Sequence, residues 1–458
     1  MRDPAASAAA PRRASTFHLV FLTYSVICSG AYGLEQMVSA SGPGLTILVM
    51  VALPILWAIP LTLICAELSA GYPVEGGYYR WVRLAFGDFI GYQAGWLVYL
   101  ANLTTNAAFA VLFASYLGHL VPGLEGEWRW MAALALIWAT TLLNYLGIRL
   151  VGVTSVVLTI LLLLPFLFMT LLGLIQWRYN PLVPFAPPGV GWIEAFGSSL
   201  MIAVWLYSGY EKLTTNAGEV ENPSRAFPIA LAIAVPMAVL SYLIPTVVGL
   251  AACDDWSHWG EAHFSVLARA IGGPSLGLFM TLGGLLSNIC LLMVTILGQS
   301  RLPMVMAEDR LFPGAFGRVS RRFGTPVVSL MAGAALLSLL SRQRFAELTG
   351  LFSLVQVLAY CLICAALLRL RQRSPTAGAD PAGDMGSAVP AAGGRPPFRI
   401  PLGSTALLLM MIPSFVITGF VVVERFWNAG VFDVRRIGLD LLAFASGPLT
   451  YFVFRRRR

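Results

Sequence analysis

The sequence predicts an all-α, polytopic membrane protein, and three features indicate this fold class. Of the 458 residues, 58% are hydrophobic and 11% are charged, whereas a soluble domain has about 45–50% apolar and about 25% charged residues. The apolar residues form long runs, and a bilayer core needs roughly 20 of them per helix. Lys and Arg lie at the ends of these runs, so the net charge of +8 does not indicate nucleic-acid binding. A soluble enzyme is excluded as well.

Twelve apolar runs are long enough to cross a bilayer. We do not interpret the first as a cleaved leader, because Glu35 lies in its second half and eleven more runs follow. The predicted spans are residues 17–41, 45–68, 91–120, 130–147, 150–176, 193–217, 226–252, 274–304, 325–341, 346–369, 402–424 and 436–454.

The distribution of basic residues predicts the orientation. With the N-terminus in the cytoplasm, 22 of the 30 Lys and Arg residues fall on the inner side and 8 on the outer side. Inner loops of membrane proteins carry this excess, so both termini are expected in the cytoplasm. All basic residues except Lys212 are Arg, which is typical of GC-rich coding. We therefore expect a bacterial inner membrane.

Motifs for nucleotide or metal chemistry are missing from the sequence. Lys212 follows Glu211 rather than a Gly-rich run, so it does not form a P-loop. The four His are scattered near span ends, without zinc-ligand spacing. Five of the six Cys lie in apolar runs, which argues against an external disulfide framework. We expect no cofactor, and any transport must use an ion gradient or exchange.

The first and sixth spans each carry a Ser-Gly pair in mid-span, then an aromatic residue, then a carboxylate. Glycine weakens helix continuity, and an unwound backbone at membrane depth is tolerated where it lines a cavity. Breaks at matching places in two halves point to an inverted-repeat transporter site. The candidate substrate-binding residues here are Ser29, Gly30, Ala31, Tyr32, Gly33, Glu35, Trp205, Tyr207, Ser208, Gly209 and Glu211.

The carboxylates Glu35 and Glu211 are the candidates for proton coupling. A carboxylate at membrane depth costs about 2.5–3.5 kcal/mol on insertion scales, so it normally faces a cavity. Both acids can hold a substrate ammonium or carry a proton. The alternative is that each caps a resumed half-helix, where acids are favoured.

Further polar residues lie within the spans. Asn106 and Asn288 are candidate substrate-binding residues, although hydrogen bonding between helices explains them equally well. Ser287 and Asn288 offer oxygens to a sodium ion, so sodium coupling stays an alternative to proton coupling. Lys212 needs a counter-charge, for which Glu67, Glu219 and Glu221 are candidates.

The order of several short motifs resembles that of the amino acid–polyamine–organocation (APC) superfamily of permeases. The resemblance covers most of the chain. Its motifs are CAEL at 65–68, YPVEGGYY at 72–79, GW at 95–96, NYLG at 144–147, SGYE at 208–211, AGEVENP at 217–223, SR at 300–301 and MAEDRLFP at 306–313.

Within this superfamily, YGLE at 32–35 and the AGEVENP stretch are most similar to the polyamine-uptake and L-type amino acid transporter-like branch. Glu35 is the more discriminating residue, because many amino-acid permeases carry a small residue there. One departure is Thr105 before Asn106, where the polyamine branch has an acid; a long polycation would lose one counter-charge. The resemblance implies a LeuT-like inverted repeat of five plus five helices, with discontinuous helices 1 and 6.

We therefore expect a secondary active transporter that moves amino acids or polyamines by alternating access in proton-coupled symport. The alternatives are an amino-acid exchanger and, more remotely, a membrane receptor or enzyme. Its partners are a small-molecule substrate and the lipid bilayer, without nucleic acid, as a monomer or weak homodimer. The expected segments are an N-terminal tail (1–16), a ten-helix core (17–371), a flexible cytoplasmic linker (372–401), two peripheral helices (402–454) and a basic tail (455–458).

Overall fold

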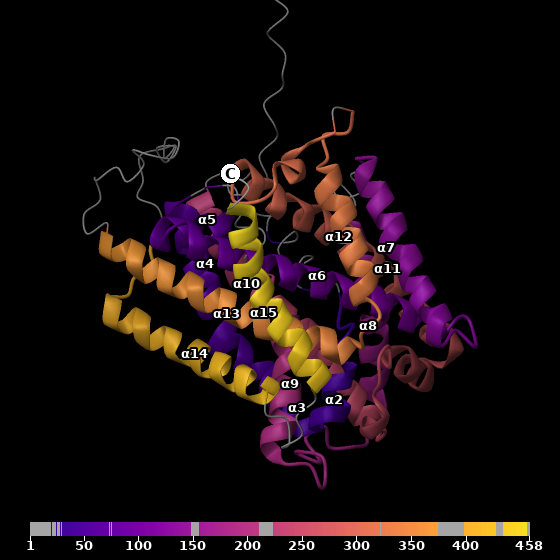
Figure 1. Cartoon of the computed structure of the whole chain (residues 1–458). Helices are drawn as coiled ribbons and strands as arrows, with labels where there is room; N and C mark the ends of the chain where they lie inside the picture. The colour runs from indigo at the N-terminus through magenta and orange to yellow at the C-terminus, as the bar shows by residue number, and fades with distance from the viewer. Residues whose placement is uncertain are drawn as a thin grey trace, which may run out of the picture.

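Every regular element that the computed structural model describes is a helix (Figure 1). The described residues are 20, 24, 28, 30–72, 74, 76–147, 155–209, 223–320, 322–373, 398–426 and 434–455. The helices are α2 (Glu35–Ser41), α3 (Pro43–Leu53), the π-helix η1 (Pro54–Ala58), α4 (Ile59–Gly71), α5 (Gly77–Phe86), α6 (Asp88–Gly118), α7 (Gly126–Tyr145), α8 (Ser155–Ile175), α9 (Trp192–Leu206), α10 (Pro223–Ala252), η3 (Trp256–His258), α11 (Phe264–Glu308), η4 (Gly314–Gly317), α12 (Val327–Leu340), α13 (Phe345–Arg373), α14 (Ser404–Phe426) and α15 (Val434–Arg455).

Seven of the described helices are long and apolar enough to cross a membrane. This confirms an all-helical, polytopic membrane protein, while the count of twelve spans stays a prediction. The described helices nevertheless begin and end close to the predicted spans. The seven are Pro43–Gly71, Asp88–Gly118, Ile229–Ala252, Phe264–Glu308, Phe345–Arg373, Ser404–Phe426 and Ile437–Arg455.

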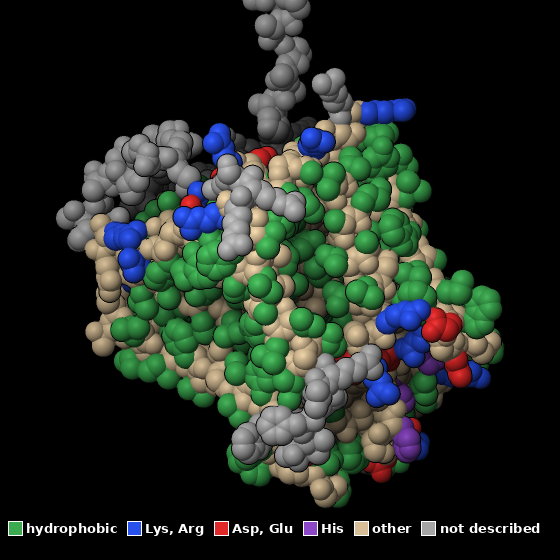
Figure 2. Space-filling view, viewed as in Figure 1, with side chains coloured by type: hydrophobic (Ala, Val, Ile, Leu, Met, Phe, Trp, Pro, Cys, Tyr) green, Lys and Arg blue, Asp and Glu red, His purple; other side chains and the backbone are tan. Residues whose placement is uncertain are grey.

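Helices α6 and α11 form the centre of the bundle, and α14 and α15 lie at its edge (Figure 1). In α6, 78% of the apolar window is buried, against 28% in α14 and 17% in α15. Figure 2 shows hydrophobic side chains over most of the visible face, between charged groups at the end near the C-terminus and at the opposite end. Such a belt suits contact with lipid.

The short helix α5 was not predicted. The predicted second span ends at residue 68, and residues 69–90 were assigned to no span; the structure places Tyr78 and Tyr79 in α5, after a break at Gly76 with φ of 86°. The helix is amphipathic: its tyrosines are buried, and Arg80 and Arg83 lie on the other side. Polar residues between apolar ones hide such a helix from a search for uniform apolar runs.

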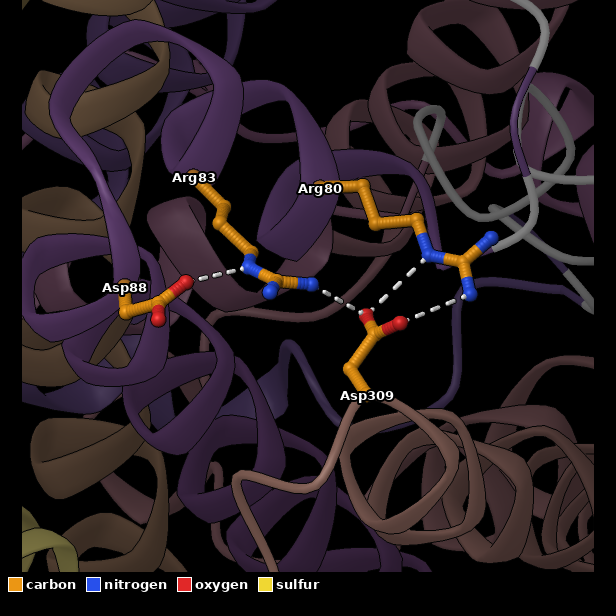
Figure 3. A network of polar contacts seen from close by, with 4 residues as sticks. All are labelled: Arg80, Arg83, Asp88 and Asp309. Carbon is orange, nitrogen blue, oxygen red and sulfur yellow. Dashed lines mark hydrogen bonds and ion pairs between the residues drawn. The ribbon is translucent and has the colours of Figure 1, made fainter. Parts of the chain in front are cut away.

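A carboxylate at the end of α11 anchors α5 (Figure 3). Arg80 donates to the two oxygens of Asp309 from Nε and Nη2, each at 3.3 Å. Arg83 Nη1 lies 2.9 Å from Asp309 Oδ2, and its Nε donates to Asp88 Oδ1 at 2.6 Å. These four side chains join α5, the first turn of α6 and the C-terminal end of α11.

Glu67 at the end of α4 pairs with Arg371 at the end of α13. The Arg371 Nε donates to Glu67 Oε1 at 2.6 Å, and Ile400 N donates to Glu67 Oε2 at 2.8 Å. Glu67 was a candidate counter-charge for Lys212; its partner among the described residues is Arg371, whose guanidinium matches both carboxylate oxygens. Lys212 lies outside the described residues.

A second buried ion pair joins the two peripheral helices. Arg425 of α14 donates from Nε to Asp440 Oδ2 at 2.7 Å and from Nη2 to Oδ1 at 3.0 Å. The side chains are 4% and 0% exposed. Gly350 of α13 makes room for the guanidinium, since a Cβ there would lie 2.4 Å from Arg425 Nη1. The pair thus packs the α14–α15 hairpin on the core.

Candidate functional site

The predicted break in the first span is present. Cys28 and residues 30–34 are not helical, and α2 begins only at Glu35. Gly30 and Gly33 adopt φ of 105° and 96°, a region that glycine enters without steric cost. The sequence pattern was therefore sufficient to locate this break.

The sixth span also stops being helical at the predicted place. Helix α9 ends at Leu206, where Tyr207 N donates to Ala203 O. Ser208 and Gly209 are not helical, and Gly209 has φ of 111°. The predicted site residue Glu211 lies outside the described residues, as does Ser29 of the first span.

The two breaks lie side by side on a common cavity. Helix α2 packs on α9, and a Cβ at Gly33 would lie 3.0 Å from the Trp205 ring. Five predicted site residues line the cavity: Gly30, Tyr32, Trp205, Ser208 and Asn288. The other lining residues are Thr105, Phe109, Leu206, Tyr242, Ser287, Leu291, Thr295 and Phe352.

Several predicted site residues lie behind this lining. Asn106 donates to Gln299 Oε1 and accepts from Thr295 Oγ1, so its amide joins α6 to α11. The Tyr207 hydroxyl donates to Met50 O at 2.9 Å. Ala31, Gly33, Glu35 and Gly209 are also buried but are not among the lining residues.

Glu35 is held at the start of α2, with only 1% of the residue exposed. The Tyr116 hydroxyl donates to its Oε1 at 2.6 Å, and Gly33 N donates to its Oε2 at 2.7 Å. Within the described part of the chain, no Lys, Arg or His forms an ion pair with it. Glu35 therefore satisfies the backbone at the helix start, and two hydrogen bonds rather than a cation stabilise its carboxyl group.

Two tyrosines connect Glu35 with the cavity. The rings of Tyr32 and Tyr116 meet edge to face, with centroids 5.4 Å apart. Two successive glycines of α11 accommodate them: a Cβ at Gly283 would lie 2.3 Å from the Tyr32 hydroxyl, and one at Gly284 would lie 2.6 Å from the Tyr116 ring. Tyr32 lines the cavity, so the path from the cavity to Glu35 runs through these two side chains.

Polar contacts join the segment before α11 to α2, α6 and α7. Ser39 donates to Trp259 O at 2.6 Å. Glu261 accepts from Ser115 Oγ at 2.6 Å and pairs with Arg129. This segment contains η3, and the first turns of α11 follow it; Gly273, with φ of 79°, separates those turns from the rest of α11.

Sequence reasoning offered Ser287 only as a sodium ligand and did not assign Thr105, Phe109, Leu291 or Thr295 to the site. Thr105 and Phe109 are four residues apart in α6, and Ser287, Leu291 and Thr295 recur every fourth residue in α11. This spacing places each set on one helix face. The helical period shows which residues share a face of a helix, but it does not show which face borders the cavity.

Chemically, the cavity offers aromatic rings, hydroxyl groups, one amide and unwound backbone. This set suits binding of a small molecule rather than covalent catalysis. In the ranges that the structure describes, no three His, Cys, Asp or Glu side chains could together hold a metal ion.

Comparison with known proteins identifies the family. The amino acid permease family model matches residues 15–436. Polyamine transporter RMV1 of Arabidopsis thaliana is 32% identical over 437 residues, which cover 94% of this chain and 84% of that protein. Polyamine transporter PUT1 of Oryza sativa subsp. japonica is 31% identical over 448 residues, with 97% and 80% covered.

A bacterial relative is more distant. An uncharacterized transporter of Legionella pneumophila is 27% identical over 349 residues, which cover 69% of this chain and 73% of that protein. The family match spans most of the chain, and the helices and the cavity agree with it. The chain therefore belongs to the amino acid permease family, and it is a multi-pass membrane transporter rather than an enzyme.

Proposed function

We propose that this protein takes up polyamines or amino acids across the membrane, with the cavity between the two helix breaks as the substrate site. The observation that carries the proposal is the meeting of both non-helical segments at one cavity. The names of the plant relatives, which share about a third of its residues, add polyamines to the substrates that the family model suggests.

The breaks also support alternating access through an inverted repeat. Unwound helices at matching positions are typical of transporters in which two helix groups rock around a fixed site. In this proposal the first ten spans form the repeat of five plus five helices. Helices α14 and α15 are additions at its edge, consistent with their small buried fraction.

Proton coupling is proposed to act through Glu35. The described residues give this buried carboxyl group no cation partner, and a buried carboxyl group without one binds a proton rather than staying charged. Tyr116 donates to Glu35 and packs against Tyr32 at the cavity. A change of protonation at Glu35 would therefore alter a hydrogen bond next to the substrate site.

For orientation, we propose that the end of the bundle with α5 faces the cytoplasm. Arg80, Arg83 and Arg455 lie at this end, near the C-terminus (Figure 1, Figure 2). An excess of basic residues is typical of the inner side. The almost exclusive use of Arg over Lys, typical of GC-rich coding, is the observation that favours a bacterial inner membrane.

A thermal-shift panel on purified protein tests the substrate class. Bound ligand stabilises a protein by about 2.7 kcal/mol at a hundredfold excess over its Kd, so substrates are expected to raise the unfolding temperature by several degrees. We expect shifts with putrescine, spermidine or amino acids and none with sugars or nucleotides. A shift with sugars or nucleotides, and none with amines or amino acids, would contradict the proposed substrate class.

A further inference from the structure

The lining of the cavity extends along α11. Ser287, Leu291 and Thr295 line it and follow one another at about one helical turn. With a rise of 1.5 Å per residue, the eight steps from Ser287 to Thr295 span roughly 12 Å. This length exceeds the distance between the ammonium and carboxylate groups of an amino acid, which are attached to the same carbon.

A buried hydroxyl group lies one helical turn before the Ser287 end of this lining. Among the residues that the structure describes, the Tyr32 hydroxyl has no hydrogen-bond partner, and it lies against Gly283, one turn before Ser287. The residue is 6% exposed. Its ring is held by Tyr116 and by Phe166, whose centroid is 4.8 Å away, so the hydroxyl is fixed in place.

A second buried hydroxyl group marks the other end. Helices α6 and α11 are antiparallel, since Tyr116 lies on Gly284 whereas Asn106 bonds Thr295 and Gln299. Thr105, next to Asn106, is therefore near the level of Thr295.

The hydroxyl of Thr105 is unusual among the threonines around it. Thr105 is 5% exposed, and its Oγ1 has no hydrogen-bond partner within the described ranges. The hydroxyl of neighbouring Thr104 donates instead to Ala101 O at 2.9 Å and to Leu100 O at 3.1 Å. A buried hydroxyl without a partner is unfavourable, so a ligand that bonds Thr105 relieves this cost.

The lining between the two hydroxyl groups carries no charged side chain: besides the polar Ser208, Ser287 and Asn288, it is aromatic and aliphatic. Phe109, Trp205 and Phe352 contribute rings, and Leu291 contributes an aliphatic surface. None of the described lining residues is Asp, Glu, Lys or Arg. Such a lining accommodates methylene groups, and ring faces attract ammonium groups.

We propose that this cavity selects linear diamines by their length, with the hydroxyl groups of Tyr32 and Thr105 each accepting a hydrogen bond from one ammonium group. This inference rests on the proposed function and narrows its substrate class. The carboxyl group of Glu35, beyond Tyr116, lies nearer the Tyr32 end. A short diamine reaches one hydroxyl only, whereas a long one reaches both.

The test compares each diamine with the monoamine of equal chain length, because every added methylene raises the affinity of both. Competition binding on the purified full-length protein gives the four affinities. Diaminopropane is expected to bind no better than propylamine. Diaminooctane is expected to bind at least about tenfold better than octylamine, the effect of one hydrogen bond to a charged group.

Variants at neighbouring threonines assign this gain to one hydroxyl group. Thr105→Val keeps the shape and is expected to abolish the gain of diaminooctane over octylamine, whereas Thr105→Ser keeps the hydroxyl and the gain. Thr104→Val is the matched control, since the Thr104 hydroxyl bonds only to its own helix; it is expected to keep the gain.

Three outcomes would overturn the inference. One is an equal gain from the second amino group at both chain lengths. Another is a gain that survives in Thr105→Val, or that falls equally in Thr104→Val. The third is binding of amino acids without any diamine, which refutes the length selection but leaves the proposed transport intact. Absence of binding by all amines and amino acids would refute both proposals.

Discussion

Glu35→Gln is expected to abolish uptake against a concentration gradient while leaving substrate binding within tenfold of the unmodified protein. The carboxamide keeps the shape and can accept the hydrogen bond from Tyr116, but it cannot bind and release a proton. Glu35 is not among the cavity-lining residues, and both of its oxygens are hydrogen-bonded. Binding is measured by competition with putrescine, arginine and alanine, and accumulation by labelled uptake into proteoliposomes.

The same variant separates the three roles that the sequence allowed for Glu35. If Glu35 bonds a substrate ammonium directly, putrescine and arginine should lose tenfold or more in affinity and alanine far less, because a charged hydrogen bond contributes about 1.5–3 kcal/mol. If Glu35 only caps α2, neither binding nor accumulation should change beyond the loss of stability. Glu127→Gln is the control, since Glu127 is an exposed acid, 74% accessible in its pair with Arg342.

Breaking the Arg425–Asp440 pair is expected to have the largest effect on stability. Removing one partner of a buried pair costs about 3–5 kcal/mol, because the other charge stays buried without compensation. Arg425→Met and Asp440→Leu should therefore each lower the unfolding temperature of the purified protein by several degrees. The double variant should recover most of this loss, since an apolar pair leaves no uncompensated charge.

The control for this comparison is again an exposed pair. Glu127→Gln removes a surface ion pair worth about 0–1 kcal/mol and should leave the unfolding temperature nearly unchanged. Equal shifts for Glu127→Gln and Arg425→Met would show that the buried pair does not hold the α14–α15 hairpin on the core. A double variant less stable than both single ones would lead to the same conclusion.

Most of the described helices could be predicted from the sequence, because their apolar runs match the thickness of a bilayer. Glycine and serine in mid-span also located both breaks, since few other residues tolerate the backbone conformations of Gly30 and Gly209. Helix α5 escaped prediction because it is amphipathic. The break at Gly273 agrees with the predicted start of the eighth span at residue 274.

The sequence predicted a residue of the candidate site only where the residues next to it in the chain indicated its role. Tyr32, Trp205 and Asn288 lie on the cavity as their positions in the spans suggested. Glu35 and Tyr207 point to partners on other helices, Tyr116 and Met50, which no local pattern reveals. Thr105 differs from Thr104 only in the face of α6 on which it lies, and packing of α6 against α11 decides that face.

Gradient-driven uptake tests the central claim most directly. Proteoliposomes that contain the purified protein are given labelled putrescine or arginine outside and an inward proton gradient, without substrate inside. The account predicts accumulation above the external concentration, which a protonophore abolishes. Entry that only reaches equilibrium, or that requires a second substrate inside the vesicles, would contradict proton-coupled symport and identify a facilitator or an exchanger.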